Sequence, residues 1–315
     1  MTRDRAAGIG RSDGPRAYSE RECAARLATL LAPRTGDIGE ELTLELSEYF
    51  RTSLDEIRER LSTATASFTE EWNARVADER DEGAVTRFYN ESRTEIFDLA
   101  QWHAQDPIHY RVLMCADIAH ERGCRDYLDY GSGIGSDALV FASVGCRVTL
   151  ADVSEPLLAF AKWRCERRGF AVNTIDLKNS RPPRRQFDAV VCFDVLEHIH
   201  RPLRTLWTIQ QSMRPGGMLF MHAPFGPDPD RPMHVVHQDV VTPKMRTVGF
   251  HRRDDLETPF PQWLWHPLVY QSFAVSPLDR LGYRVYDEWL GGGTGAWLAR
   301  AYRRLRPNRY ALRLD

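Results

Sequence analysis

Three glycines on alternate positions, Gly131, Gly133 and Gly135, come directly after an apolar run that ends at Asp129 and Tyr130. This order predicts a strand, a tight turn and the start of a helix, because glycine tolerates left-handed backbone angles and has no Cβ atom. Backbone amides in such a turn can approach a bound ligand closely, and the helix N-terminus favours polar or negatively charged groups. The turn alone is equally typical of a purely structural element.

Three further signals follow the glycine turn along the chain. Asp152 ends the apolar strand RVTLAD about 20 residues beyond Gly131, which is the spacing of a carboxylate that holds both hydroxyls of a ribose. The strand FDAVVCF ends at Phe193 and is followed by Asp194 and the tetrapeptide VLEH. The turn MRPGG then precedes the strand MLFMH. With the glycine turn upstream, a ribose contact at Asp152 is favoured over a simple helix cap.

In this order the four segments resemble motif I, the acidic end of strand two, motif IV and the L-x-P-G-G turn of the class I S-adenosylmethionine (SAM) methyltransferases. The resemblance covers about residues 107–302. It implies an enzyme that uses SAM, forms S-adenosylhomocysteine and methylates an oxygen or nitrogen of a small molecule. Secondary metabolites and amino sugars are the acceptor classes that it favours.

The resemblance also implies which residues bind the cofactor. Gly131, Gly133 and Gly135 would pass close to the methionine part of SAM, and Asp129 would bind its amino group. The other implied contacts are Asp152 on the ribose, Val153 on the adenine, Asp176 and Leu177 near the adenine amino group, and Phe193 and Asp194 on the methionine side.

Transfer of a methyl group from a sulfonium needs alignment more than covalent help. Alignment contributes up to about 7–11 kcal/mol, whereas a general base adds about 10²–10⁴-fold in rate. Histidine suits such a base near neutral pH. The candidates are His222 at a strand end, His234 and His237 in the segment after it, and His198 after motif IV, with Tyr89 as an aromatic residue that closes over the cofactor. Each of them taken alone is as typical of a structural residue.

The elements that must position these residues alternate between strand and helix from about residue 125 onward. Strands are expected at 127–130, 147–151, 172–175, 188–193 and 218–222, with helices at 137–144, 156–168 and 202–213. Such alternation predicts an α/β, Rossmann-like doubly wound sheet with its ligand at the carboxyl ends of the strands. Two strands at 283–290 and 296–302, joined by three glycines, would form a hairpin and give a mostly parallel seven-stranded sheet with an antiparallel last strand.

The chain divides into three expected parts. Residues 1–16 form a disordered tail, 17–106 a helical N-terminal cap or dimerisation region, and 107–315 the SAM-binding core, with a lid insertion at about 224–275. Within the cap, helices are predicted to begin after Ser19, Asp37 and Ser53, and Gly83 is expected to break the pattern before one long helix over 85–103. A homodimer formed through these helices is one arrangement that the division allows.

Composition excludes several classes of protein. The chain has 315 residues, of which 43% are hydrophobic, and a net charge of −2. No apolar run is long enough for a membrane span, and the N-terminus has no signal-like core, so we expect a cytoplasmic protein with no membrane partner. Arginines gather at 181–185 and 300–313, but the near-zero net charge makes a solvated face the better interpretation and argues against a nucleic-acid partner.

Four alternatives remain open beside a metal-free small-molecule methyltransferase. A nucleic-acid methyltransferase is disfavoured because motif IV lacks the Asn/Asp-Pro-Pro-aromatic sequence, and a nicotinamide dehydrogenase because Ser136 stands where its fingerprint needs glycine or alanine. A non-catalytic subunit of the same fold is disfavoured by the intact glycines. A metal-assisted sugar O-methyltransferase would use a site drawn from His198, His200, His222, His234 and His237 with Asp194 or Asp239, but none of these shows a typical metal spacing.

Overall fold

The computed structural model describes residues 19–104, 106–228, 231–236, 238–257 and 267–290. Its N-terminal part is helical: α1 (Glu20–Leu31), α2 (Ile38–Phe50), α3 (Leu54–Ser62), α4 (Ala64–Arg75), α5 (Glu82–Glu91) and α6 (Glu95–His103). The side chains of Ser19, Asp37 and Ser53 each accept a hydrogen bond from a backbone N–H in the first turn of α1, α2 and α3. These caps confirm the predicted helix starts.

The prediction of one helix over 85–103 is wrong. Gly83 lies inside α5, which begins after Asp81, because the Asp81 carboxylate accepts hydrogen bonds from the N–H groups of Gly83 and Ala84. The break comes instead at residues 92–94, where Ser92 and Thr94 both hydrogen-bond to Glu71 of α4. Side-chain hydrogen bonding by Ser and Thr competes with helix continuation here.

The core is one mixed sheet of seven strands in the order β3-β2-β1-β4-β5-β7-β6. The strands are β1 (Asp126–Tyr130), β2 (Arg147–Asp152), β3 (Val172–Asp176), β4 (Phe187–Phe193), β5 (Met213–His222), β6 (Phe250–Arg252) and β7 (Leu268–Ser272). The first five are parallel, and β7 pairs antiparallel with both β5 and β6. The predicted α/β class and the antiparallel strand are confirmed.

The prediction of a strand at residues 283–290 was wrong. Residues 277–290 form the helix α12 (Pro277–Leu290), not a strand, and the strand expected at 296–302 lies outside the described residues. The antiparallel pair β6 and β7 comes instead from the segment that the sequence assigned to a lid. That segment also contains η2 (Thr242–Val248) and α11 (Asp254–Glu257).

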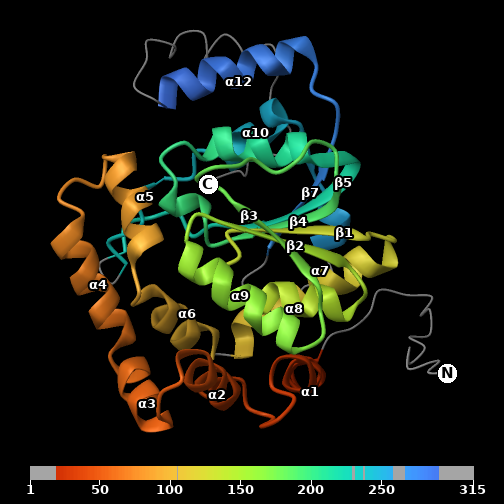
Figure 1. Cartoon of the computed structure of the whole chain (residues 1–315). Helices are drawn as coiled ribbons and strands as arrows, with labels where there is room; N and C mark the ends of the chain where they lie inside the picture. Colours follow the sequence, from red (N-terminus) through yellow and green to blue (C-terminus); the bar gives the residue numbers. More distant parts are fainter. Residues whose placement is uncertain (1–18, 105, 229–230, 237, 258–266, 291–315) are drawn as a thin grey trace.

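Helices cover both faces of the sheet, as Figure 1 shows. On one face lie α7 (Asp106–Glu121), α8 (Ser136–Ser143) and α9 (Glu155–Arg167), and on the other lie α10 (Pro202–Ser212) and, farther out, α12. Neighbouring residues of β1 point to opposite faces, so Tyr127 belongs to one apolar cluster and Leu128 to the other. Among the described residues, no helix is long and apolar enough to cross a bilayer.

Candidate active site

A cavity of about 750 Å³ opens where β1, β2 and β4 end. Its floor is formed by the residues at the ends of these strands, and its walls come from α5, α6 and the segments 224–228 and 231–234 that follow β5. An apolar cluster holds those walls together, because Met233 packs with Phe68, Trp72 and Phe88 of the N-terminal helices. The cap and part of the predicted lid thus enclose one site at the carboxyl edge expected for this fold.

The glycine turn brings its backbone to this cavity. Gly131 and Gly133 have φ angles of +78° and +48°, and both line the cavity. A Cβ atom on Gly131 would lie 2.3 Å from Val195 Cγ2, so no other residue fits there without displacing the motif IV loop. Gly135 does not line the cavity. A Cβ atom on it would lie 2.8 Å from the Cβ of Ala161, so this glycine allows α9 to pack closely against the turn.

Two buried carboxylates face the turn. Asp152 accepts a hydrogen bond of 2.9 Å from the Gly133 N–H and another of 2.9 Å from the Ser154 N–H, and it still lines the cavity. Asp129 is 3% exposed, and its Oδ2 has no hydrogen-bond partner among the described residues. Burial, together with the nearby carboxylates of Asp137 and Asp152, raises the pKa of Asp129 well above its usual value. A cation beside Asp129 would relieve this cost.

Asp194 belongs to a buried ion-pair network at the end of β4. It has a left-handed φ of 54°, and its carboxylate pairs with Arg111 of α7 and with His222 Nδ1, the latter at 2.5 Å. Burial opposes ionisation of Asp194, but these two partners outweigh it and hold its pKa well below the usual value. Arg111 also lies over the Phe193 ring, 4.6 Å from its centroid. The network fixes the motif IV backbone beside the cavity.

A second group of titratable side chains meets at the opposite wall. His198 Nδ1 lies 2.9 Å from the carbonyl oxygen of Met233 and 3.1 Å from the Tyr89 hydroxyl. Because the carbonyl can only accept, the ring hydrogen is placed on Nδ1, which leaves the lone pair on Nε2. Glu197 Oε1 lies 3.9 Å from that Nε2. Ligand atoms of Glu197, His198 and His234 all lie within 4.8 Å of one another.

The structure therefore brings together most of the predicted residues. Asp129, Gly131, Gly133, Asp152, Val153, Leu177, Phe193, Asp194, Tyr89, His198 and His234 line the cavity. Gly135, Asp176 and His222 do not: Asp176 instead accepts hydrogen bonds from the Lys178 N–H and the Asn179 side chain. His237 lies outside the described residues. The cavity also contains Arg111 and Glu197, which the sequence did not single out.

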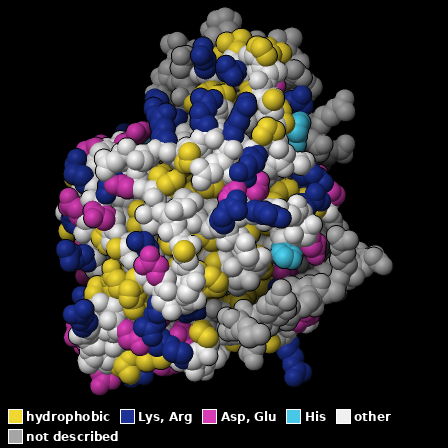
Figure 2. Space-filling view, turned by 45° about the vertical axis from the view of Figure 1, so that its right-hand side comes forward, with side chains coloured by type: hydrophobic (Ala, Val, Ile, Leu, Met, Phe, Trp, Pro, Cys, Tyr) yellow, Lys and Arg dark blue, Asp and Glu magenta, His cyan; other side chains and the backbone are white. Residues whose placement is uncertain are grey.

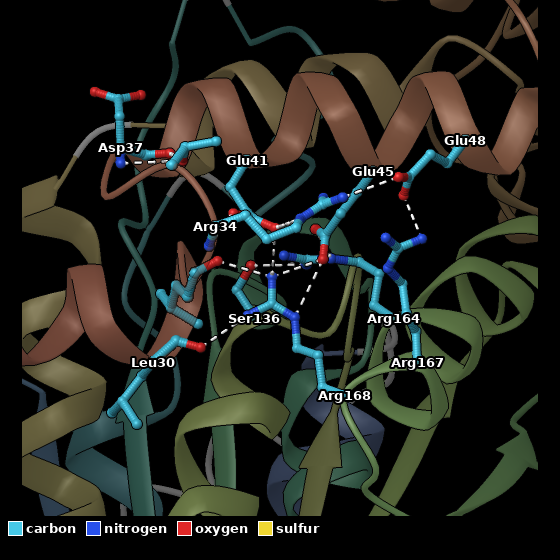
Figure 3. A network of polar contacts seen from close by, with 12 residues as sticks. Leu30, Arg34, Asp37, Glu41, Glu45, Glu48, Ser136, Arg164, Arg167 and Arg168 are labelled. Carbon is cyan, nitrogen blue, oxygen red and sulfur yellow. Dashed lines mark hydrogen bonds and ion pairs between the residues drawn. The ribbon is translucent and has the colours of Figure 1, made fainter.

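A polar network supports the glycine turn from the side of α9 (Figure 3). Arg164, 1% exposed, donates from Nη1 to the carbonyl oxygen of Ile134 at 2.6 Å and to Ser136 Oγ at 3.1 Å. Its Nε pairs at 2.7 Å with Glu45 of α2, which is equally buried. Burial opposes ionisation of Glu45, yet Arg164 and Arg168 together hold its pKa below the usual value. The network ties the helical cap directly to the cofactor-binding turn.

The features of the cavity fit SAM. The unpartnered Asp129 oxygen suits an ammonium group, the Asp152 carboxylate suits ribose hydroxyls, and the close backbone of Gly131 and Gly133 suits the methionine part. Val153 and Leu177 supply apolar surface for an adenine ring. The buried Asp129 carboxyl is the most telling of these features, because its Oδ2 has no hydrogen-bond partner among the described residues.

Comparisons with known proteins agree with this assignment. The family model for the methyltransferase domain matches residues 52–275, which is more than half of the chain. A ubiquinone biosynthesis O-methyltransferase from Coxiella burnetii is 33% identical over 95 residues, covering 30% of this chain and 41% of the relative. A probable S-adenosylmethionine-dependent methyltransferase from Mycolicibacterium smegmatis is 29% identical over 148 residues, covering 44% of this chain and 57% of the relative.

Among solved structures, the chain is similar to 1,6-didemethyltoxoflavin-N1-methyltransferase from Burkholderia thailandensis, with 21% identity and a TM-score of 0.45 over 63% of this chain and 92% of the other. The curated relatives named above are matched over only about half of their length. The family model, by contrast, spans the cap helices from α3 onward, the glycine turn and the whole sheet. The chain belongs to the methyltransferase-domain family and is a class I SAM-dependent methyltransferase.

Proposed function

We propose that this chain transfers the methyl group of SAM to an oxygen or nitrogen of a small molecule, with secondary metabolites and amino sugars as the first acceptors to test. The observation that carries the proposal is the enclosed cavity in which the glycine turn, Asp129 and Asp152 meet at the ends of β1 and β2. Incubation of the full chain with SAM and a panel of amino-sugar, phenolic and amino-acid acceptors, followed by mass spectrometry, tests it. A product heavier by one methylene supports the proposal, and its absence from every acceptor counts against it.

SAM supplies a methyl group on an already activated sulfonium. Asp129 would bind the ammonium group of SAM and Asp152 its ribose, and the backbone of Gly131 and Gly133 would pass close to the methionine part. The cap helices and the segments 224–228 and 231–234 would exclude water and hold the acceptor in line, which is where most of the rate enhancement arises. The remaining requirement is a group that accepts the proton that the acceptor loses.

Glu197 is the side chain best placed to accept that proton. It is fully buried, and neither of its carboxylate oxygens has a hydrogen-bond partner among the described residues. Burial, together with the nearby negative charge of Asp194, raises its pKa well above the usual value, which makes it a stronger base than an exposed glutamate. Burial lowers the pKa of His198 to about 4, so this ring is neutral near pH 7 and its Nε2 can accept a hydrogen bond from the acceptor.

Replacing Glu197 by Gln should lower kcat/KM about 10²-fold while leaving SAM affinity nearly unchanged. A base must be ionised, so activity of the native protein should rise with pH through the raised pKa of Glu197 and then level off. The variant should lose this rise, and His198 should add no step between pH 5 and 8 because its pKa is about 4. Glu82→Gln is a matched control, since Glu82 also lines the cavity but is exposed. Equal pH profiles for both variants would exclude Glu197 as the base.

A metal-assisted reaction is the second candidate. Glu197, His198 and His234 offer ligand atoms within 4.8 Å of one another, and the contact of His198 Nδ1 with a carbonyl oxygen leaves Nε2 free to coordinate. If Glu197 acts as the base, treatment with a chelator followed by gel filtration should change activity less than twofold. If activity is instead abolished, and magnesium, manganese or zinc restores it, the metal-assisted mechanism replaces the proposed one.

A further inference from the structure

A second cleft, of about 440 Å³, lies outside the active site between α10, α12 and the segment that follows β3. We call it the arginine cleft, because four of its lining residues are arginines: Arg181, Arg184, Arg280 and Arg284. The others are Pro182, Trp207, Thr208, Gln211 and Tyr283. In Figure 2, Lys and Arg side chains gather toward the top of the molecule, at the level where Figure 1 places α10 and α12.

The charge of the arginine cleft is not balanced within the described part of the chain. No carboxylate lines it, and none of its four guanidinium groups forms an ion pair with a described residue. Many other arginines do pair, for example Arg26 with Asp117 at 2.7 Å. The net charge of the whole chain is only −2, so the excess of positive charge is local. Four neighbouring guanidinium groups give this cleft a local positive potential that attracts anions.

The cleft is built on packed residues. The Trp207 and Tyr283 rings stack with centroids 4.7 Å apart and an angle of 7° between their planes, which fixes α12 against α10. Arg280 lies over the Trp207 ring, 5.9 Å from its centroid. Arg184 donates a hydrogen bond of 2.6 Å to Gln211 Oε1. These contacts orient two of the guanidinium groups, and oriented guanidinium forks are the groups that best match phosphate oxygens.

One helix links the arginine cleft to the active site. Arg204 and Thr205, in the first half of α10, line the methyl-transfer cavity, whereas Thr208 and Gln211 line the cleft. At 1.5 Å per residue, Arg204 and Thr208 are about 6 Å apart along the helix axis, and Gln211 is about 10 Å from Arg204. A small molecule that occupies both sites would have to extend about 10 Å along α10, past Arg204.

We infer that the arginine cleft binds phosphate groups of the methyl acceptor, so that the acceptor is a phosphorylated small molecule whose uncharged end enters the cavity. This inference rests on the proposed methyl transfer. It defines the substrate class by charge: a mono- or diphosphate ester with an oxygen or nitrogen nucleophile about 10 Å from the phosphate.

Binding of pyrophosphate to the full chain tests the cleft itself. Calorimetry at constant ionic strength should show binding to the native protein and at least a tenfold weaker affinity for Arg280→Gln/Arg284→Gln. A matched control is Arg21→Gln/Arg122→Gln, since these two arginines are exposed elsewhere, and it should bind like the native protein. No binding, or equal binding by both double variants, overturns the assignment of the cleft.

The link to the acceptor is tested with pairs of acceptors that differ only by a phosphate, such as an amino-sugar phosphate and its free amino sugar. The native protein should methylate the phosphorylated member with a kcat/KM at least tenfold higher, and Arg280→Gln/Arg284→Gln should lose that preference. Equal rates for both members overturn the inference even if pyrophosphate binds. SAM affinity of the native protein is measured in parallel, because it tests the proposed function separately from the inference about the phosphate. If the native protein does not bind SAM, the proposed function itself is refuted.

Discussion

Replacing Asp152 by Ala should weaken SAM binding by about 10²-fold or more. Asp152 ends β2, lies 7% exposed at the cavity, and is the carboxylate that we propose holds the ribose. Hydrogen bonds to a charged group contribute about 1.5–3 kcal/mol each, so the loss of two contacts with the ribose hydroxyls accounts for a weakening of this size. The variant also loses the acceptor of the Gly133 N–H bond, which loosens the turn that faces the cofactor. Calorimetric titration of SAM measures the effect.

Asp176→Ala is the matched control for this variant. Asp176 ends the neighbouring strand β3 and pairs in register with Asp152, but its carboxylate does not line the cavity. SAM affinity of the control should stay within a factor of about two or three of the native value. Equal affinities for Asp152→Ala and the native protein would contradict the placement of the ribose at β2.

Replacing Arg164 by Met should lower the free energy of unfolding by about 3 kcal/mol, because it leaves a buried carboxylate with only part of its charge compensated. Arg164 and Glu45 are each 1% exposed, and Arg168 alone would remain beside Glu45, at 2.6 Å. The substitution also removes the donor to the Ile134 carbonyl inside the glycine turn. We therefore expect SAM affinity to fall about tenfold even at temperatures where the variant is folded.

Glu48→Gln is the matched control, since Glu48 pairs with Arg34 and Arg167 on the exposed side of the same helix. Exposed pairs contribute about 0–1 kcal/mol, so this variant should stay close to the native stability. Arg164→Lys should recover only part of the loss, because a lysine keeps the charge but cannot reach Glu45 and the turn at once. Denaturant unfolding and SAM titration of the three variants measure both effects. If Glu48→Gln lowered the free energy of unfolding as much as Arg164→Met, burial of the Arg164–Glu45 pair would not explain the effect.

The parts of the site that the sequence predicted are those fixed by local backbone geometry. Gly131 and Gly133 need positive φ angles and a close approach of neighbouring atoms, and only glycine meets both conditions. Asp152 follows from its place at the end of an apolar strand. These constraints act within one strand and one turn, so the residue types alone reveal them.

The candidate base could not be predicted, because it depends on which segments meet in space. Tyr89 and His198 are far apart in the sequence, but the Tyr89 hydroxyl lies 3.1 Å from His198 Nδ1 in the cavity wall. His222, which the strand pattern placed at the site, turns toward Asp194 instead. Glu197 stands beside His198 in the sequence, and only the fold shows that it is buried with neither carboxylate oxygen hydrogen-bonded to a described residue. Arg111 gave one overlooked signal, a charged residue next to the apolar run of α7.

The strand predicted at residues 283–290 was wrong for a similar reason, because strand pairing also depends on which segments meet in space. Residues 283–290 precede three glycines, which suggested the first strand of a hairpin, yet Asp279, Gly282, Val285 and Tyr286 are buried at helical spacing in α12. The real antiparallel strand β7, which lies between β5 and β6, comes from a segment rich in proline and tryptophan, and its buried residues Val269 and Tyr270 form too short a run to stand out. Short runs of this kind are ambiguous until the neighbouring strand is known.

Calorimetric titration of the native full chain with SAM and, separately, with NAD tests the central claim most directly. The fold and the cavity predict saturable binding of one SAM per chain, with a dissociation constant between about 1 μM and 1 mM, as is typical for enzyme substrates, and no heat from NAD. Binding of NAD without binding of SAM would contradict the identification of the cavity as a methyl-donor site.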